Sequence, residues 1–343
     1  MSEKRLPCVA ISSVCGSWRL AVLLSLAMGL GLSSWLPAQE PAPKAAKGAK
    51  SADDEKDEIP EPVELKGAAL MTKDGVALTA TYYPSNQGKK AVPVVLLHSF
   101  NGDRQKFGDL GEYLQNLGYA VLSLDLRFHG KSTNQNGALA AIKQMRTLSP
   151  AEYVNMYVKD MEAVRSFLVK ENDDGKLNLN ALAIVGTEMG AAVAVHFAGY
   201  NNCFLPRVEP DLHRMPSPDV KGLVLISPSP NIPPALSIIK GLGTYTALKS
   251  DLPMLILVGK EDHKAIKDAD QIYKLIKPLH ADSQDENQKQ TFYYVRLPTK
   301  LQGAELFTDA ARELKVNEII ANFLRSCVVE PAYPWRPRRM PGN

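Results

Sequence analysis

The chain has 343 residues, of which 45% are hydrophobic and 22% are charged, and these values exclude a wholly disordered, collagen-like or multispan membrane protein. Forty Lys and Arg residues against 37 Asp and Glu residues give a formal net charge of +3, too small and too evenly spread to indicate nucleic acid as a partner. The four cysteines lack the paired C-x-x-C spacing of a zinc or redox site. We therefore predict neither a metal site nor a cofactor.

Residues 1–38 have the order of a signal peptide. Lys4 and Arg19 precede an apolar run, residues 20–36, and Ala38 is small enough for a signal-peptidase site. We favour cleavage. The alternative is an uncleaved membrane anchor, because the run is at the lower limit of the roughly 20 residues that span a bilayer. In both cases the rest of the chain is predicted to be exported to the periplasm or the extracellular space.

A polar segment separates this signal from the folded part of the chain. Residues 39–62 are rich in Ala, Lys, Asp, Glu and Pro, so they cannot bury enough apolar surface to offset chain entropy and are predicted to form a disordered linker. The folded domain is expected over residues 63–328, and the basic tail 329–343 is expected to fray. An oxidising compartment would permit a disulfide between Cys203 and Cys327, and the sequence leaves this pairing open.

Short apolar segments rich in β-branched residues predict the strands of one domain. The first two, 63–71 and 76–83, flank Asp74-Gly75, a dipeptide typical of tight hairpin turns, and predict an antiparallel start. The later segments are continuous, as expected for strands buried on both faces: 92–97, 119–126, 181–185, 220–226, 252–258 and 291–297. Predicted helices alternate with them: 107–117, 150–171, 188–198, 265–279 and 305–326. This order predicts an α/β fold with a doubly wound, mostly parallel sheet and functional residues at the carboxyl ends of the strands.

Three motifs fall at the ends of successive predicted strands. Residues 94–102 (VVLLHSFNG) run from a strand into a turn, 125–132 (DLRFHGKS) follow the next strand, and 183–190 (AIVGTEMG) combine a strand, a sharp turn and a helix start. The order, spacing and placement of these motifs resemble the α/β-hydrolase superfamily, especially its dienelactone-hydrolase and serine-aminopeptidase-like branches. The resemblance covers roughly residues 63–327.

This resemblance implies a role for each motif. The first offers an oxyanion-hole N–H group at Phe100, the second braces the fold, and the third is the G-x-S-x-G nucleophile elbow. The second N–H group of the oxyanion hole would come from Met189, the residue after the nucleophile. The resemblance therefore implies an α/β-hydrolase fold with a hydrolytic site at the strand ends.

The catalytic triad that the family uses is incomplete in this sequence. Glu188 stands at the nucleophile position in place of serine, Asp262 fits the acid position, and Gln302 aligns with the histidine position. An amide cannot take and return a proton as imidazole does, and loss of a triad member leaves only about 10³ to 10⁴-fold residual acceleration. We therefore favour a non-catalytic protein that binds an unidentified small molecule or protein partner.

Two alternatives remain open at this stage. Glu188 could serve as a carboxylate nucleophile or base in an ester, epoxide or haloalkane hydrolase, because haloalkane dehalogenases and epoxide hydrolases place an aspartate at the elbow. With Gln302 in the histidine position, however, nothing activates the water that must hydrolyse the ester intermediate. The other alternative is an enzymatic activity carried by residues outside the triad-equivalent positions. The amino end of the following helix is expected to hold Glu188 ionised.

Histidines near the motifs are expected to be structural: His98, His129 and His196. His263 follows Asp262, so these two residues and Glu188 could form a cation site, which we disfavour. The segment 227–251, where relatives insert a lid, is short and rich in Pro, Ser and Gly. It predicts a minimal lid and an open cleft.

Overall fold

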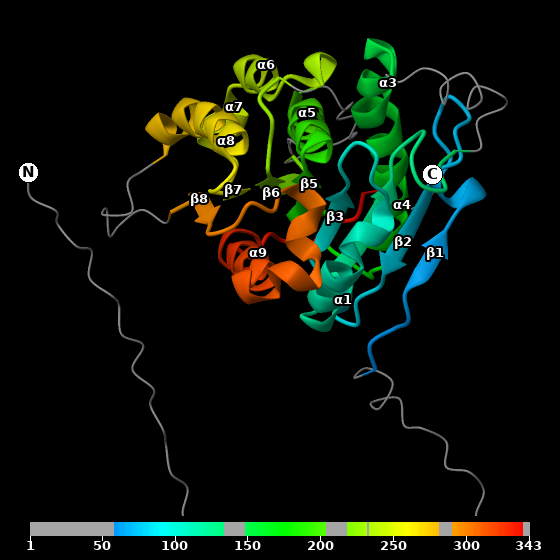
Figure 1. The fold of residues 1–343 in the computed structure, drawn as a ribbon. Helices are drawn as coiled ribbons and strands as arrows, with labels where there is room; N and C mark the ends of the chain where they lie inside the picture. Colours follow the sequence, from blue (N-terminus) through cyan, green and yellow to red (C-terminus); the bar gives the residue numbers. More distant parts are fainter. Residues whose placement is uncertain (1–57, 134–147, 204–217, 232, 281–289, 339–343) are drawn as a thin grey trace, which may run out of the picture. The chain divides into compact units, whose positions relative to one another are not determined.

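The computed structural model describes residues 58–133, 148–203, 218–231, 233–280 and 290–338 (Figure 1). The predicted signal segment, residues 1–38, lies outside this part of the chain, as does the linker up to residue 57. Within the described residues, no helix combines the length and the apolar character needed to cross a bilayer. Cys327 is buried, but the side chain of Cys203 is outside the described set, so their pairing stays open.

An eight-stranded sheet, in the order β1-β2-β4-β3-β5-β6-β7-β8, forms the centre of the described domain. The strands are β1 (Val63–Leu65), β2 (Thr79–Tyr83), β3 (Pro93–Leu97), β4 (Ala120–Asp125), β5 (Leu182–Thr187), β6 (Val220–Ile226), β7 (Met254–Gly259) and β8 (Phe292–Leu297). The β1–β2 and β2–β4 pairs are antiparallel, and the remaining pairs are parallel. This topology confirms the predicted mostly parallel sheet with antiparallel first strands.

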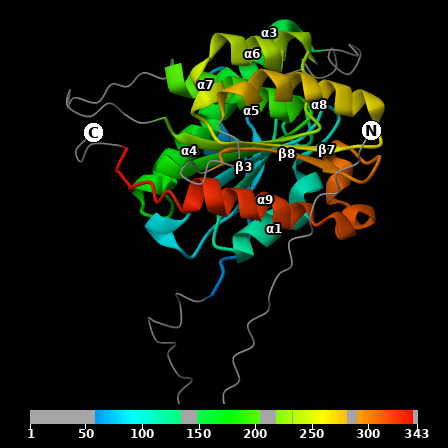
Figure 2. The same ribbon diagram turned by 90° about the vertical axis from the view of Figure 1, so that its left-hand side faces the viewer.

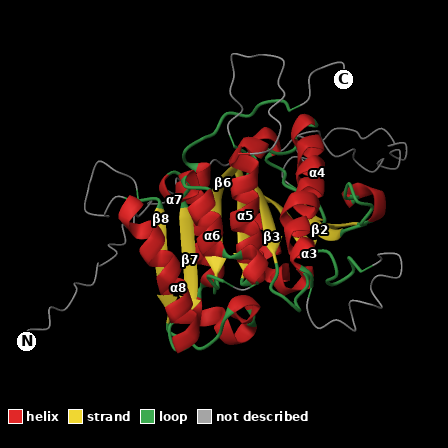
Figure 3. Ribbon diagram, turned by 90° about the horizontal axis from the view of Figure 1, so that it is seen from above, coloured by secondary structure: helices red, strands yellow, loops and turns green. Residues whose placement is uncertain are grey.

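Helices cover both faces of the sheet. One face carries α1 (Gly108–Asn116) and α9 (Val316–Leu324), as Figure 2 shows. The other carries α3 (Pro150–Asn155), α4 (Met161–Asp173), α5 (Met189–Cys203), α6 (Ile238–Thr244), α7 (Ala247–Ser250) and α8 (His263–Ile276), which lie over the strands in Figure 3. Strand side chains alternate between the two cores, with Val94 and Leu96 in one and Val95 and Leu97 in the other.

The first predicted strand is shorter than the sequence indicates. The chain leaves β1 after Leu65 and forms a 3₁₀ turn over Gly67–Leu70, in which Gly67 adopts a φ of +63°. It returns to extended pairing only at a single bridge between Met71 and Ala77. The turn places Leu70 in the core, which a continuous strand of alternating side chains would not require.

The predicted helix 305–326 is also broken. Two 3₁₀ segments, Gly303–Phe307 and Asp309–Leu314, precede α9, and a π-turn, Arg325–Val329, follows it. The physical reason lies in the buried residues Leu306, Ala311 and Val316, which lie five positions apart in the sequence. At 3.6 residues per turn such a spacing rotates each side chain by about 140°, so one straight helix could not bury all of them.

The basic tail is not frayed over the described residues 329–338. Buried asparagine amides in the last turn of α4 or ahead of β5 donate to its backbone: Asn172 to Arg336 O at 2.9 Å, Asn178 to Tyr333 O at 2.7 Å and Asn180 to Pro334 O at 2.6 Å. The Arg338 guanidinium pairs with Asp219 at 2.7 Å, and Lys89 Nζ lies 4.0 Å from the centroid of the Trp335 ring. The expectation of a fraying end is therefore wrong for this part of the tail.

Candidate active site

The turn between β5 and α5 carries Glu188 in a sharp elbow. Glu188 has a φ of +47°, a conformation that costs a residue other than glycine roughly 1–3 kcal/mol. Its N–H group donates to Ile226 O at 2.9 Å. The flanking glycines are required by contact, because an added Cβ would stand 2.4 Å from Gly190 O at Gly186 and 2.2 Å from Leu97 O at Gly190. The predicted elbow is thus formed, with a carboxylate at its tip.

The Glu188 side chain is half-buried and turned toward the loop after β8. An added Cβ on Gly303 would stand 2.7 Å from Oε1 of Glu188, so the carboxylate lies against this glycine. Burial raises the pKa of Glu188, and the nearby charge of Glu305 raises it further. Among the described residues, no N–H group donates to the carboxylate. This upward shift of the pKa is opposite to the lowering expected from the amino end of α5.

Gln302 is bound at both ends of its amide. Its Oε1 accepts from Ser227 Oγ at 2.6 Å and from the Gly259 N–H group at 3.3 Å, while its Nε2 donates to Gly259 O at 3.0 Å. Its backbone N–H donates to the Glu305 carboxylate at 3.3 Å. The amide therefore links the ends of β6 and β7, and it is fixed in one orientation.

Ser227 is the site residue that sequence reasoning missed. It has a φ of +47°, and besides donating to Gln302 it accepts from the Gly303 N–H group at 2.9 Å. Its position directly after the predicted strand 220–226 is the signal that could have singled it out, because functional side chains gather at the carboxyl ends of parallel strands.

Asp262 caps α8. In the described part of the chain, no hydrogen bond joins it to Gln302. Its Oδ1 accepts from the N–H groups of Lys264 and Ala265 at 2.9 and 3.0 Å. Asp262 therefore does not orient the Gln302 amide through a hydrogen bond.

A pocket of about 390 Å³ brings together the side chains and N–H groups expected at the site. Phe100, Glu188, Met189, Asp262 and Gln302 all line it. The wall also includes Tyr153, Ser227, Asp268 and Lys264, but no histidine is among its described lining residues. The N–H groups of Phe100 and Met189 have no acceptor within the described part of the chain, which leaves them available to a ligand.

Comparison with known proteins agrees with the fold described above. Residues 88–249 match the family model described as serine aminopeptidase, S33, and this range includes all three motifs but neither Asp262 nor Gln302. An esterase of Pyrococcus furiosus is similar over 82% of this chain and 97% of its own, with 16% identity and a TM-score of 0.53. The chain has the α/β-hydrolase fold. An esterase of Pyrobaculum calidifontis is similar over 79% of this chain and 87% of its own, with 16% identity and a TM-score of 0.51.

A dienelactone hydrolase of Anabaena variabilis is similar over 78% of this chain and 99% of its own, with 17% identity and a TM-score of 0.48. The comparison with curated proteins found no sequence match. The family model and the two esterase structures support the α/β-hydrolase fold for this chain.

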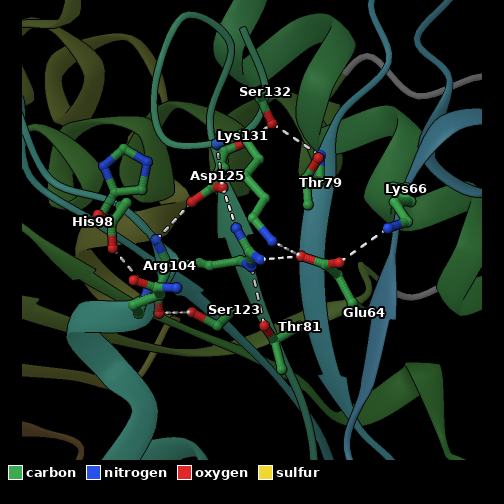
Figure 4. Close-up of polar contacts among 12 residues, drawn as sticks. Glu64, Lys66, Thr79, Thr81, His98, Arg104, Ser123, Asp125, Lys131 and Ser132 are labelled. Carbon is green, nitrogen blue, oxygen red and sulfur yellow. Dashed lines mark hydrogen bonds and ion pairs between the residues drawn. The ribbon is translucent and has the colours of Figure 1, made fainter. Parts of the chain in front are cut away.

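Within this α/β-hydrolase fold, the motif after β4 forms a buried ion cluster (Figure 4). Asp125 accepts from the N–H group and Nη1 of Arg104 at 2.6 and 2.5 Å, and from the Lys131 N–H group at 2.8 Å. Ser132 joins the cluster to β2 by accepting from the Thr79 N–H group at 2.9 Å. These contacts hold Arg104, which follows the turn after β3, against the loop after β4.

Three histidines that were expected to be structural, His98, His129 and His196, bind backbone groups. Nε2 of His98 accepts from the Leu126 N–H group at 3.1 Å, so the proton is on Nδ1, which donates to Ser99 O at 2.7 Å. Burial lowers the pKa of His98 to about 4. His129 and His196 bind backbone carbonyl oxygens of Arg127 and Ser237, respectively.

His263 is exposed at the start of α8. The described residues hold no group of three or more His, Cys, Asp or Glu side chains placed to bind a metal ion. The disfavoured cation site of Glu188, Asp262 and His263 therefore gains no support from their geometry.

Proposed function

We propose that this chain is an exported, non-catalytic protein that binds a small ligand in the pocket around Glu188. The observation that carries this proposal is the bonding of Gln302. Its amide is held at both ends by Ser227 and Gly259, at the position where an α/β-hydrolase needs an imidazole that moves protons. The elbow carries a carboxylate in place of the serine nucleophile, and no histidine among the described lining residues could act as its base.

The charge of the pocket supports a ligand that carries an ammonium group. Its lining holds the carboxylates of Glu188, Asp262 and Asp268 against the single ammonium of Lys264. Oδ1 of Asp262 accepts from two α8 N–H groups, whereas Glu188 is half-buried without a hydrogen-bond donor among the described residues. A cation next to Glu188 would offset the cost of burying its charge. Phe100 and Tyr153 add aromatic surface that favours a cation.

A second function is favoured by one specific observation. Burial raises the pKa of Glu188 toward the range of a general base, and the N–H groups of Phe100 and Met189 remain available to stabilise an oxyanion. These features support a hydrolase of the ester, epoxide or haloalkane type that uses Glu188 as base or nucleophile. Against it stands the absence of a base for the second step, since Gln302 cannot activate water.

Binding of an aromatic amine tests the preferred function. Titration of the purified protein with benzylamine, followed by calorimetry, should give saturable binding at neutral pH, and the neutral analogue benzyl alcohol should bind at least tenfold more weakly. Glu188→Gln should remove this preference for the amine. Asp309→Asn is the matched control, because Asp309 is an exposed carboxylate outside the pocket. Equal binding of amine and alcohol would contradict the proposal.

Protonation gives the same test a pH dependence. Because the pKa of Glu188 is raised, the group loses its charge at a higher pH than an ordinary glutamate. Amine affinity should therefore fall as the pH is lowered through that pKa, and Glu188→Gln should abolish the dependence.

Export is the part of the proposal that rests on residues 1–38 alone. The positive flank, apolar run and small residue before Gln39 support it. Expression of the full chain in a bacterial host, followed by fractionation and intact-mass measurement, should find the protein outside the cytoplasm. A product shorter by the signal would favour cleavage, and a full-length membrane-bound product would favour the anchor. A soluble full-length protein in the cytoplasm would contradict export.

A further inference from the structure

A second pocket of about 430 Å³ lies between α1 and α9, at the other end of the strands from Glu188. Val92 and Tyr119, which line it, directly precede β3 and β4, whereas the residues of the first pocket follow the strands. Figures 1 and 2 both show α1 and α9 side by side on one face of the sheet. A cavity of this size is within the range of roughly 300–1,000 Å³ that holds small-molecule ligands.

Tyr119 is a buried polar side chain with an unused hydroxyl group in this pocket. The residue is only 5% exposed, and its hydroxyl has no hydrogen-bond partner among the described residues. The oxygen is not among the fully buried side-chain atoms of the described residues, so it reaches the open space of the pocket, where it can donate to a ligand. Burial raises the pKa of Tyr119 to about 12, which keeps the hydroxyl protonated and able to donate.

Cations line this pocket without a carboxylate among its lining residues. Lys90 and Arg325 line the pocket, and none of its lining residues is acidic. Neither cation forms a salt bridge within the described part of the chain, and Arg325 only donates to Asn322 Oδ1 at 3.1 Å. The charge of the pocket is therefore complementary to an anion.

The rest of the lining includes apolar side chains. Leu117 and Val329 are 53% and 41% exposed, and Val92 and Ala321 lie deeper. Asn322, Arg325 and Val329 follow one helical face, and the π-turn Arg325–Val329 continues that face beyond α9. Local π-turns of this kind often occur at functional sites.

We propose that this pocket binds the carboxylate of a small amphipathic acid. The Tyr119 hydroxyl and the Arg325 guanidinium donate to the carboxylate, the Lys90 ammonium adds charge, and a hydrocarbon chain covers Leu117 and Val329. Charge-assisted hydrogen bonds give the head group its specificity, and burial of apolar surface gives the chain its affinity. The site is separate from the pocket around Glu188 and does not depend on the function proposed for it.

Octanoate is the probe that tests this site. Calorimetry with the purified full chain should show saturable binding of octanoate, whereas octan-1-ol, which keeps the chain, and acetate, which keeps the head group, should each bind at least tenfold more weakly. Arg325→Gln should weaken octanoate binding by about tenfold or more, and Tyr119→Phe by about three- to tenfold. Arg312→Gln, at an exposed arginine outside the pocket, should leave binding unchanged.

The variants also separate the two pockets. Glu188→Gln should leave the octanoate affinity unchanged, and thermal unfolding of Arg325→Gln should match the parent because this side chain is exposed. Absence of octanoate binding up to millimolar concentration, equal binding of octanoate and octan-1-ol, or full binding by both the Arg325 and the Tyr119 variant would overturn the proposal.

Discussion

The carboxylate of Glu188 lies against Gly303 so closely that a Cβ on this glycine would stand 2.7 Å from Oε1. Gly303 also has a φ of +52°, and its N–H group donates to Ser227 Oγ at 2.9 Å. The elbow after β5 and the loop after β8 are therefore sterically coupled, and the side chain at position 188 limits what position 303 can hold.

This coupling predicts the effect of Gly303→Ala. The substitution should destabilise the protein by about 2–4 kcal/mol, because it combines a left-handed backbone with a steric clash. Gly67→Ala is the matched control: its φ is +63° with no atom within 4 Å of an added Cβ, so it should cost only about 1–2 kcal/mol. Chemical unfolding measures both. Adding Glu188→Ala to the Gly303 variant should restore at least about 1 kcal/mol, and strictly additive effects would refute the contact.

Stability should depend on pH through Glu188. Its pKa is raised in the folded state, so the wild type loses stability as the pH rises from the unfolded-state pKa through the folded one. Gln cannot ionise, and the stability of Glu188→Gln relative to wild type should therefore increase between about pH 4 and 8. Urea unfolding across this range checks the sign. Glu305→Gln should reduce the effect, because Glu305 is the second cause of the shift; a difference that falls with rising pH would mean that the carboxylate is stabilised when charged.

The ion cluster after β4 should contribute strongly to stability. Asp125→Ala leaves the buried Arg104 guanidinium without its buried carboxylate partner and should cost about 3–5 kcal/mol. Asp309→Ala breaks the exposed pair with Arg312 and should cost less than about 1 kcal/mol. Denaturant midpoints of the two variants give the comparison. Similar small losses in both would show that Asp125 does not brace the loop.

Restoring the triad positions tests how the site is aligned. Glu188→Ser alone should give little esterase activity, since Gln302 supplies no base. The double variant Glu188→Ser with Gln302→His should hydrolyse short nitrophenyl esters about 10²-fold faster than the single variant, a typical contribution of general acid–base catalysis. Only Oδ1 of Asp262 is used in capping α8, which leaves Oδ2 for the imidazole. A folded double variant without activity would place the histidine position elsewhere or indicate a defective oxyanion hole.

Local sequence patterns were sufficient for the sheet and for the elbow. Continuous β-branched segments mark the parallel strands, and the segment 220–226 matches β6 residue for residue. Gly186 marks the elbow because an added Cβ would meet backbone atoms of Gly190 and Ala191 in the same turn. These features depend on residues that are close together in the sequence, so local patterns are enough to predict them.

Features that depend on distant contacts could not be predicted in the same way. The bonding of Gln302 to Ser227 and Gly259 joins residues more than forty positions apart. The direction of the Glu188 pKa shift follows from burial and from Glu305, whereas the sequence shows only that a helix begins beside it. The docked tail likewise depends on asparagines over 150 positions away, such as Asn178 with Tyr333.

The most direct test of the account is a turnover assay of the purified protein and its Glu188→Gln variant against short-chain nitrophenyl esters, an epoxide and a haloalkane. If the site is non-catalytic, neither protein exceeds the uncatalysed rate with any substrate, and serine-directed fluorophosphonates do not label the wild type. Turnover by the wild type that disappears in Glu188→Gln would contradict this account and make Glu188 a catalytic carboxylate.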